Sequence, residues 1–290
     1  MKLAITGSNG FIGRHLLEFF LEKNFHVVGM QRIKPFVQKN LSFFYYDLEN
    51  LVEFDSLKDI DFLIHCAFSE FSDHNRDSDL INLNAAENLI AECQGKNIKI
   101  IYLSTFSAHK NAKSHYGINK FELESLFKAA GHLVLRIGVV VSTDGGMFPH
   151  MLDTIRSSKV LPLISGGNQP MQFIDIECLC LVISKLIKYK GSFKEFNISS
   201  VDSIAMKKFY NKIENKLHIK RYHLYIPMWI MFLALKFTKL IGKELPFNRE
   251  NLLGLKAMRH FETQDSLKEL GVPAFFLQDV FQIFFSKTEK

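Results

Sequence analysis

A short apolar segment followed by three regularly spaced glycines opens the chain. Residues 3–5 are apolar, and Gly7, Gly10 and Gly13 follow at intervals of three. A strand that passes through such a loop into a helix is typical of dinucleotide-binding proteins, because glycine permits a tight turn, close approach to a pyrophosphate and close helix packing. Backbone N–H groups at the start of the helix then face the phosphates. The alternative is an ordinary glycine turn between any strand and any helix.

The pattern after the loop predicts an α/β fold. Apolar residues recur at helical spacing as far as Asn24, and a second strand is expected over residues 26–30. The continuous apolar run at 62–64 indicates a parallel strand that is covered on both faces. We expect a doubly wound parallel sheet of the Rossmann type. Its other elements are expected at residues 42–46, 61–66, 99–103, 132–141 and 195–198 as strands, and at 80–95 and 178–188 as helices.

Charge and cysteine content limit the classes of partner. The net charge is +6, but no basic run is dense enough for a nucleic-acid surface, and an anionic small molecule accounts for the excess equally well. The four cysteines form no Cys-x-x-Cys pair and lie in apolar stretches. We therefore expect reduced, buried thiols in a cytoplasmic protein, with neither disulfides nor a metal site. The N-terminal apolar run is too short for a signal peptide.

One stretch, residues 225–235, is unusually apolar. It is too short to cross a bilayer, which takes ~20 residues, so the first expectation is a buried helix. The flanking residues Lys236, Lys239 and Lys243 leave a second interpretation open, in which the helix contacts a membrane surface or a partner.

The end of the second strand bears on the choice of dinucleotide. An acidic residue there would hold the 2′-hydroxyl of the adenosine ribose, but the chain reads Gly29-Met30-Gln31-Arg32. The guanidinium of Arg32 suits a 2′-phosphate, so we expect NADP rather than NAD. An ordinary solvent-facing arginine is the alternative. Asp47 and Leu48, after the third strand, could hydrogen-bond the adenine.

A candidate site for chemistry follows the fifth strand. Ser104 and Thr105 end that strand, where open α/β sheets place their ligands. Tyr116 and Lys120 then share one face of a predicted helix. An ammonium near a phenol favours the phenolate and lowers the phenol's pKa from ~10. Tyr116 could thus exchange a proton with a carbinol oxygen that Thr105 holds, while the cofactor carries the hydride.

Together these motifs resemble the extended short-chain dehydrogenase/reductases of the NAD(P)-dependent epimerase/dehydratase family, which act mainly on nucleotide sugars. Residues 6–13 are similar to the family's TGxxGFIG loop, and 116–120 to its YxxxK motif. The resemblance implies catalysis by Thr105, Tyr116 and Lys120. It also implies that Asn82 braces the active-site backbone. The cofactor contacts that it implies are made by Tyr116, Lys120, Gly7, Asn9, Gly10, Phe11, Ile12, Gly13, Arg32, Asp47, Leu48, Ala67 and Asn82.

The resemblance also implies an organisation in two parts. A dinucleotide-binding domain would span residues 1–145, with 173–198 returning to it, and a smaller, mostly helical substrate-binding part would span 146–290. A homodimer is expected, and Arg249, Lys256 or Arg259 could hold a substrate diphosphate. The chain departs from the family at Ile137, Asp175 and Cys178 and in the short interval between Thr105 and Tyr116.

These departures concern the substrate rather than the chemistry. We expect reduction of a nucleotide-linked keto sugar first and epimerisation second. A non-catalytic nucleotide-binding sensor or assembly subunit with the same fold is the competing class.

Overall fold

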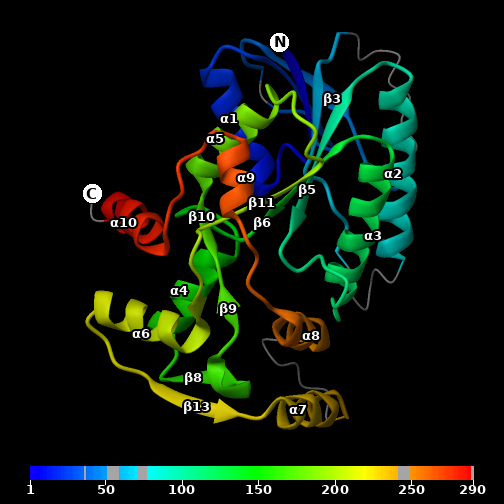
Figure 1. Cartoon of the computed structure of the whole chain (residues 1–290). Helices are drawn as coiled ribbons and strands as arrows, with labels where there is room; N and C mark the ends of the chain where they lie inside the picture. The colour runs from blue at the N-terminus through cyan, green and yellow to red at the C-terminus, as the bar shows by residue number, and fades with distance from the viewer. Residues whose placement is uncertain (36, 51–58, 71–76, 241–247, 289–290) are drawn as a thin grey trace.

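The computed structural model describes residues 1–35, 37–50, 59–70, 77–240 and 248–288. Within these residues a seven-stranded parallel sheet forms the centre of the upper part in Figure 1. Its strands stand in the order β11-β6-β5-β4-β1-β2-β3, which confirms the predicted Rossmann-type α/β fold. Their bounds are β1 (Lys2–Thr6), β2 (His26–Gln31), β3 (Leu41–Tyr45), β4 (Phe62–His65), β5 (Lys99–Thr105), β6 (Leu133–Ile137) and β11 (Glu195–Ile198).

Helices cover both faces of this sheet. Helices α1 (Phe11–Glu22) and α5 (Ile176–Leu186) pack together on one face, and α2 (Ser78–Gln94) and α3 (His115–Ala129) on the other. The short helix α9 (Gln264–Glu269) packs beside β11, and its Leu267 joins the hydrophobic core between the sheet and the α1–α5 pair. The strands read as continuous apolar runs because they are buried on both sides.

The register of the strands brings the proposed site together. Thr6 pairs with His65, and His65 pairs with Tyr102, so β5 continues three residues past its neighbour to reach Thr105. Parallel strands end at the same edge, so the glycine loop and the end of β5 share one edge of the sheet, separated by β4.

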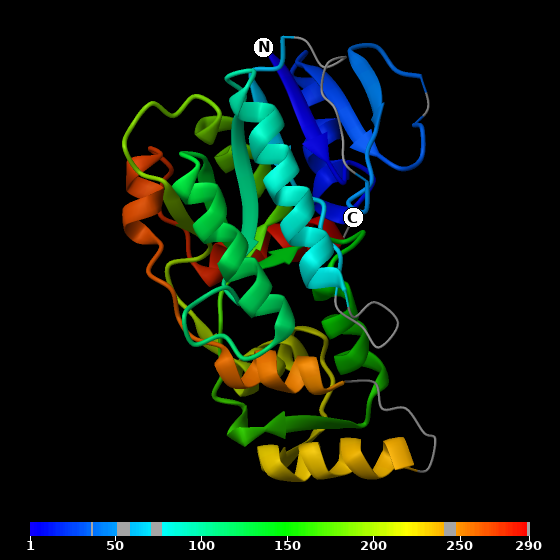
Figure 2. The same ribbon diagram turned by 90° about the vertical axis from the view of Figure 1, so that its right-hand side faces the viewer.

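Shorter elements form the lower part of the molecule in Figures 1 and 2. The single strand expected over residues 132–141 is divided at Gly138 into β6 and β7, because β6 pairs with β5 and β11 whereas β7 pairs with β10. The backbone at Gly138 is so close to Ser199 that a Cβ would lie 2.3 Å from its Oγ. The two-part division stays a proposal. The elements from β7 onward, apart from those already named, are β7 (Val139–Val141), α4 (Met147–Ser157), β8 (Val160–Ile164), η1 (Ser165–Gly167), β9 (Pro170–Met171), β10 (Phe173–Asp175), β12 (Ile204–Ala205), α6 (Met206–Lys216), β13 (Tyr222–Ile226), α7 (Met228–Leu240), α8 (Arg249–Ala257) and α10 (Leu277–Thr288).

The prediction of a buried helix over residues 225–235 is wrong. The segment begins as the end of β13, breaks at Pro227 and continues as α7. Met231 is buried against α8, but Trp229 is 66% exposed and Leu233 61% exposed, because α8 covers α7 on one side only. Lys243 and the side chain of Lys239 lie outside the described residues. The closing helix α10, in contrast, is packed into the core.

None of the helices in the described part of the chain is long and apolar enough to cross a membrane. All four cysteines are free thiols, two of them buried and two partly buried. Over the same residues, histidines, cysteines and carboxylates form no cluster suited to a metal ion.

Candidate active site

The backbone at Gly7 and Gly13 leaves no room for a side chain. Gly7 has a φ of +62°, and a Cβ there would lie 3.0 Å from the backbone of Ala67. At Gly13, the first turn of α1 passes so close to the loop that a Cβ would lie 2.2 Å from the carbonyl oxygen of Gly7. Among the described residues no side chain caps the start of α1 at Gly10, which leaves its first N–H groups for an anion. The loop therefore fits a dinucleotide pyrophosphate.

Thr6 ties this loop to the next strand of the sheet. Its hydroxyl accepts hydrogen bonds from the N–H groups of Cys66 (3.1 Å) and Ala67 (3.2 Å), so its single proton goes to Nδ1 of His65 (2.7 Å). Burial, aided by the charge of Lys120, lowers the pKa of His65 to about 3 and keeps this ring neutral. The sequence pattern alone does not single out Thr6, although its place between strand and glycine loop is a signal for such a role.

Phe11 connects the loop to the segment between β7 and α4. The ring of Phe11 lies against the backbone of Gly145 and Gly146. A Cβ added to either glycine would lie within 2.6 Å of a ring atom of Phe11. Asp144, one residue earlier, bonds Arg14 and His15 of α1, each at 3.0 Å. Of the other loop residues with a predicted cofactor role, Asn9 is exposed and Ile12 is partly buried.

The second strand ends without a carboxylate. Gln31, its last residue, accepts a hydrogen bond from the hydroxyl of Ser8 (2.6 Å) and donates one to the carbonyl oxygen of Ile33 (2.5 Å). Arg32 follows with an exposed side chain, positioned beyond the strand end as predicted. The side chain of Gln31 is thus held by the loop, whereas Arg32 remains accessible to a ligand.

The structure places Asp47 and Leu48 just after β3, at the same edge of the sheet. Asp47 is partly buried and accepts a hydrogen bond from the N–H of Glu49 at 3.4 Å. Leu48 packs against the core between the sheet and the α2–α3 pair. Ala67, directly after β4, lies beside Gly7.

Asn82 braces the segment between β4 and α2. Its side chain bonds both the N–H and the carbonyl oxygen of Ser69, each at 2.8 Å, and also Oδ1 of Asn119 at 3.1 Å. Both asparagines are almost fully buried. This arrangement joins α2 to α3 one residue before Lys120, and Asn119 is a contributor that the sequence pattern did not single out.

Thr105 and Tyr116 meet at the end of β5. Tyr116 lies in the first turn of α3, where Ser114 caps the helix by accepting from the N–H of Gly117. Desolvation raises the pKa of Tyr116 to about 12, and its hydrogen bond with Thr105 acts in the opposite direction. The tyrosine keeps 37% of its surface exposed, so a substrate can reach it.

Lys120 lies on the same face of α3 as Tyr116, as the spacing predicts, but its ammonium points elsewhere. It donates a hydrogen bond to the carbonyl oxygen of Leu103 at 2.9 Å and lies 4.3 Å above the ring of Phe68. Burial lowers the pKa of Lys120 to about 8. The expectation that Lys120 lowers the phenol's pKa is therefore wrong for this structure, because the lysine bonds β5 and desolvation dominates at Tyr116.

Phe68 joins the two halves of the site. Its ring meets that of Tyr116 edge-on, with 5.3 Å between the centroids, and carries Lys120 on its face. The preceding residue, Ala67, contacts Gly7. The glycine loop and the Tyr116–Lys120 pair therefore lie on either side of one two-residue segment.

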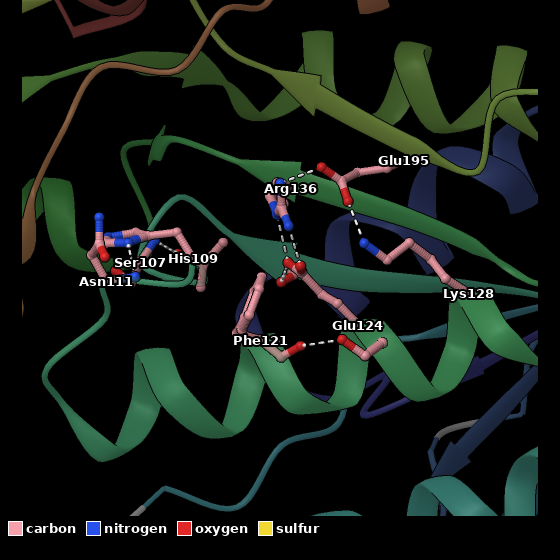
Figure 3. A network of polar contacts seen from close by, with 11 residues as sticks. Ser107, His109, Asn111, Phe121, Glu124, Lys128, Arg136 and Glu195 are labelled. Carbon is pink, nitrogen blue, oxygen red and sulfur yellow. Dashed lines mark hydrogen bonds and ion pairs between the residues drawn. The ribbon is translucent and has the colours of Figure 1, made fainter.

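A buried ion-pair network fixes α3 against the sheet (Figure 3). Arg136 of β6 makes two bonds to the carboxylate of Glu124, which is fully buried and also accepts from Ser104 at 2.5 Å. Arg136 bonds Glu195 as well, and Lys128 bonds Glu195 at 2.5 Å. Glu124 continues the four-residue spacing of Tyr116 and Lys120, a signal that could have revealed its inward orientation.

Helix α8 lies below α3 in Figure 1, and residues of α8 and of the segment after it contact the candidate site. The N–H of His115 donates to Glu250 of α8 at 2.6 Å. Phe261 stacks on Phe106, the residue after Thr105, and Arg259 lies 4.7 Å above Phe261. Of the three basic residues expected to meet a diphosphate, Arg259 is thus linked by ring contacts to the end of β5. Arg249 and Lys256 are exposed on α8.

Replacing Gly13 by alanine should impair the glycine loop. The new Cβ would overlap the Gly7 carbonyl, so we expect a loss of about 1–3 kcal/mol in the free energy of unfolding and weaker dinucleotide binding. Gly95→Ala is the matched control, because the nearest atom to its Cβ would be 3.7 Å away. Denaturant titration and cofactor fluorescence would measure both effects, and equal behaviour of the two variants would contradict the close packing.

The sheet order and the glycine loop together define a Rossmann-type dinucleotide-binding protein. The family model described as "NAD dependent epimerase/dehydratase family" matches residues 3–199. The chain belongs to this family and is an NAD(P)-dependent enzyme of the epimerase/dehydratase group.

Individual relatives are distant. A mouse protein named "Sterol-4-alpha-carboxylate 3-dehydrogenase, decarboxylating" is 22% identical, over 80% of this chain and 73% of its own length. The crystal structure of a UDP-glucose 4-epimerase from Thermotoga maritima, solved with UDP-glucose, has a TM-score of 0.71 and 15% identity over 100% of both chains. A nucleoside-diphosphate-sugar epimerase from Staphylococcus aureus has a TM-score of 0.74 and 16% identity, over 97% of this chain and 100% of its own. These two structures share the fold.

Proposed function

We propose that the protein uses NADP(H) to reduce a keto group on a nucleotide-linked sugar, with epimerisation as the second candidate. The observation that carries the proposal is the meeting of Thr105, Tyr116 and Lys120 at one edge of the sheet, beside the glycine loop. The similar structures named for UDP-glucose and nucleoside-diphosphate-sugar epimerases support a nucleotide sugar as substrate.

In this proposal the proton moves through Tyr116. Thr105 holds the substrate oxygen by a hydrogen bond, and Tyr116 donates its phenolic proton to that oxygen. A bound dinucleotide supplies the hydride to the carbon. Lys120 keeps α3 against β5 through Leu103 and contributes positive charge to the site. The glycine loop and the start of α1 hold the pyrophosphate.

The raised pKa of Tyr116 supports the reductive direction. With a pKa of about 12, the phenol is protonated at neutral pH, which is the form that a general acid needs. The reverse reaction requires the phenolate, whose population rises as the pH approaches that pKa. The rate of reduction should therefore depend little on the ionisation of Tyr116 between pH 6 and 9.

The choice of NADP over NAD rests on Arg32 and on the lack of a carboxylate at the end of the second strand, which reads Gly29-Met30-Gln31-Arg32. Arg32→Ala should weaken NADP binding by about tenfold or more, because one ion pair to the 2′-phosphate is lost, and should leave NAD binding nearly unchanged. Arg156→Ala, which removes an exposed arginine of α4, is the control. Calorimetric titration with both dinucleotides measures the difference. Equal weakening of both would refute the role of Arg32.

The remaining alternatives are separable by one experiment. Purified protein would be analysed for a copurifying dinucleotide and nucleotide sugar, and then mixed with NADPH and a panel of keto sugars while nicotinamide absorbance is followed. A sterol 4-carboxylate should be tested separately with NAD+ and NADP+ as hydride acceptors, because the mouse relative is named as a dehydrogenase of such a compound. Consumption of NADPH supports the reductase; conversion of a sugar without net consumption indicates the epimerase. Dinucleotide binding with neither would favour a sensor or assembly subunit.

We also propose the two-part organisation, with residues 1–145 and 173–198 binding the dinucleotide and 146–290 contributing the substrate side. The contacts of His115 and Phe106 with residues of the second part support it. Homodimer formation remains a prediction, which sedimentation analysis of the purified protein would test.

A further inference from the structure

The end of the molecule opposite the sheet carries a cluster of exposed apolar side chains. Figures 1 and 2 both show α7 as the outermost element there, with β13 beside it in Figure 1. Large apolar residues that are 38–80% exposed occur seven times between positions 222 and 237. We call them the end surface: Tyr222, Leu224 and Tyr225 of β13, and Trp229, Ile230, Leu233 and Phe237 of α7.

The apolar residues of α7 fall on two opposite faces. Trp229, Leu233 and Phe237 follow each other at intervals of four and therefore share the outer face. Met231 and Leu235 face the other way and pack with Leu252 of α8. A helix that is apolar all round is normally buried all round, yet one side of α7 is exposed.

The positive charge of the chain is concentrated in the stretch of sequence that contains this surface. Residues 206–240 contain eight lysines and arginines and one acidic residue, a balance of +7, whereas the whole chain has 36 basic and 30 acidic residues. The rest of the chain therefore has 28 basic and 29 acidic residues and is almost neutral. The basic residues are Lys207, Lys208, Lys212, Lys216, Lys220, Arg221, Lys236 and Lys239.

Some of these charges lie next to the exposed aromatic rings. Lys207 of α6 places its ammonium 5.1 Å from the centre of the Tyr225 ring. Lys220 is exposed two residues before Tyr222, and Lys236 is exposed on α7. Lysines around an apolar surface can extend their ammonium groups towards anionic headgroups while their alkyl stems lie along the acyl chains.

We propose that the end surface docks the protein on the face of a lipid bilayer that carries anionic headgroups. Trp229, Leu233 and Phe237 enter the headgroup–acyl boundary, and the lysines beside them contact the lipid phosphates. A second copy of the chain fits less well, because a symmetric pair would bring two surfaces of the same positive sign together. This proposal is independent of the substrate and of the reaction.

The chain offers a direct probe, because Trp229 is its single tryptophan. Vesicles of phosphatidylcholine with about one third phosphatidylglycerol should shift the protein's tryptophan emission to the blue and protect it from a water-soluble quencher. Vesicles of phosphatidylcholine alone should do much less, and added salt should reverse the shift by screening the lysines. No shift with the anionic vesicles, or equal shifts with both, would overturn the proposal.

Two sets of variants separate the apolar and the charged contributions. Leu233→Ser with Phe237→Ser should lower vesicle partitioning by about tenfold or more, whereas the exposed pair Leu181→Ser and Phe276→Ser should leave it unchanged. Lys207→Gln, Lys220→Gln and Lys236→Gln should each lower it by about fivefold. Lys188→Gln, Lys190→Gln and Lys268→Gln are the exposed controls.

Vesicle cosedimentation measures all of these variants, and circular dichroism checks that each is folded. Equal partitioning of the test and control variants would contradict the docking surface. A blue shift that depends on protein concentration without vesicles would show self-association at this surface instead, and would also overturn the proposal.

Discussion

Replacing Tyr116 by phenylalanine is expected to lower turnover by about 10²–10⁴-fold while dinucleotide binding persists. The substitution removes the proposed proton donor but retains the ring that meets Phe68 edge-on. Stopped-flow measurement of NADPH oxidation would give the rate, and fluorescence titration would give the cofactor affinity. Tyr189→Phe is the control, because it removes an exposed hydroxyl that bonds Glu269 away from the proposed site. Unchanged turnover in the Tyr116 variant would exclude the proposed acid.

Replacing Glu124 by glutamine should destabilise the protein by about 3–5 kcal/mol. The carboxylate is fully buried and pairs with Arg136, which is itself only 7% exposed, so the variant would leave much of a buried guanidinium charge uncompensated. Denaturant titration of the free energy of unfolding measures the loss. Lys128→Gln, in the partly exposed part of the same network, should cost only about 0–1 kcal/mol. A similar loss in both variants would show that burial of Glu124 is not the deciding factor.

The fold could be predicted from the sequence because its main elements repeat a simple pattern. Apolar strands buried on both faces, such as β5, appear as uninterrupted apolar runs, and the glycine loop specifies the first βαβ unit. The edge of the sheet then follows, because parallel strands present their carboxyl ends together. Thr105 and Tyr116 are predicted on this basis, and the structure places Thr105 near enough to Tyr116 to oppose the rise of its pKa.

Other features depend on which surfaces meet in three dimensions. The exposed side of α7 could not be predicted, because its apolar pattern does not indicate that α8 covers one side only. The orientation of Lys120 depends on a carbonyl group 17 positions away, at Leu103, which no helical spacing reveals. The pairing of Glu124 with Arg136 likewise joins a helix to a strand that follows it.

The contact of Ala67 with Gly7, and of Phe68 with Tyr116, makes the two ends of the site mechanically dependent on each other. A pyrophosphate that orders the glycine loop also restrains Ala67, and through the next peptide it restrains the ring against which Tyr116 and Lys120 rest. Sugar binding at Tyr116 and dinucleotide binding at Gly7 should therefore be cooperative, each raising the affinity of the other by the same factor. Ala67 and Phe68, two consecutive residues after β4, thus couple the two binding sites through their adjacent contacts.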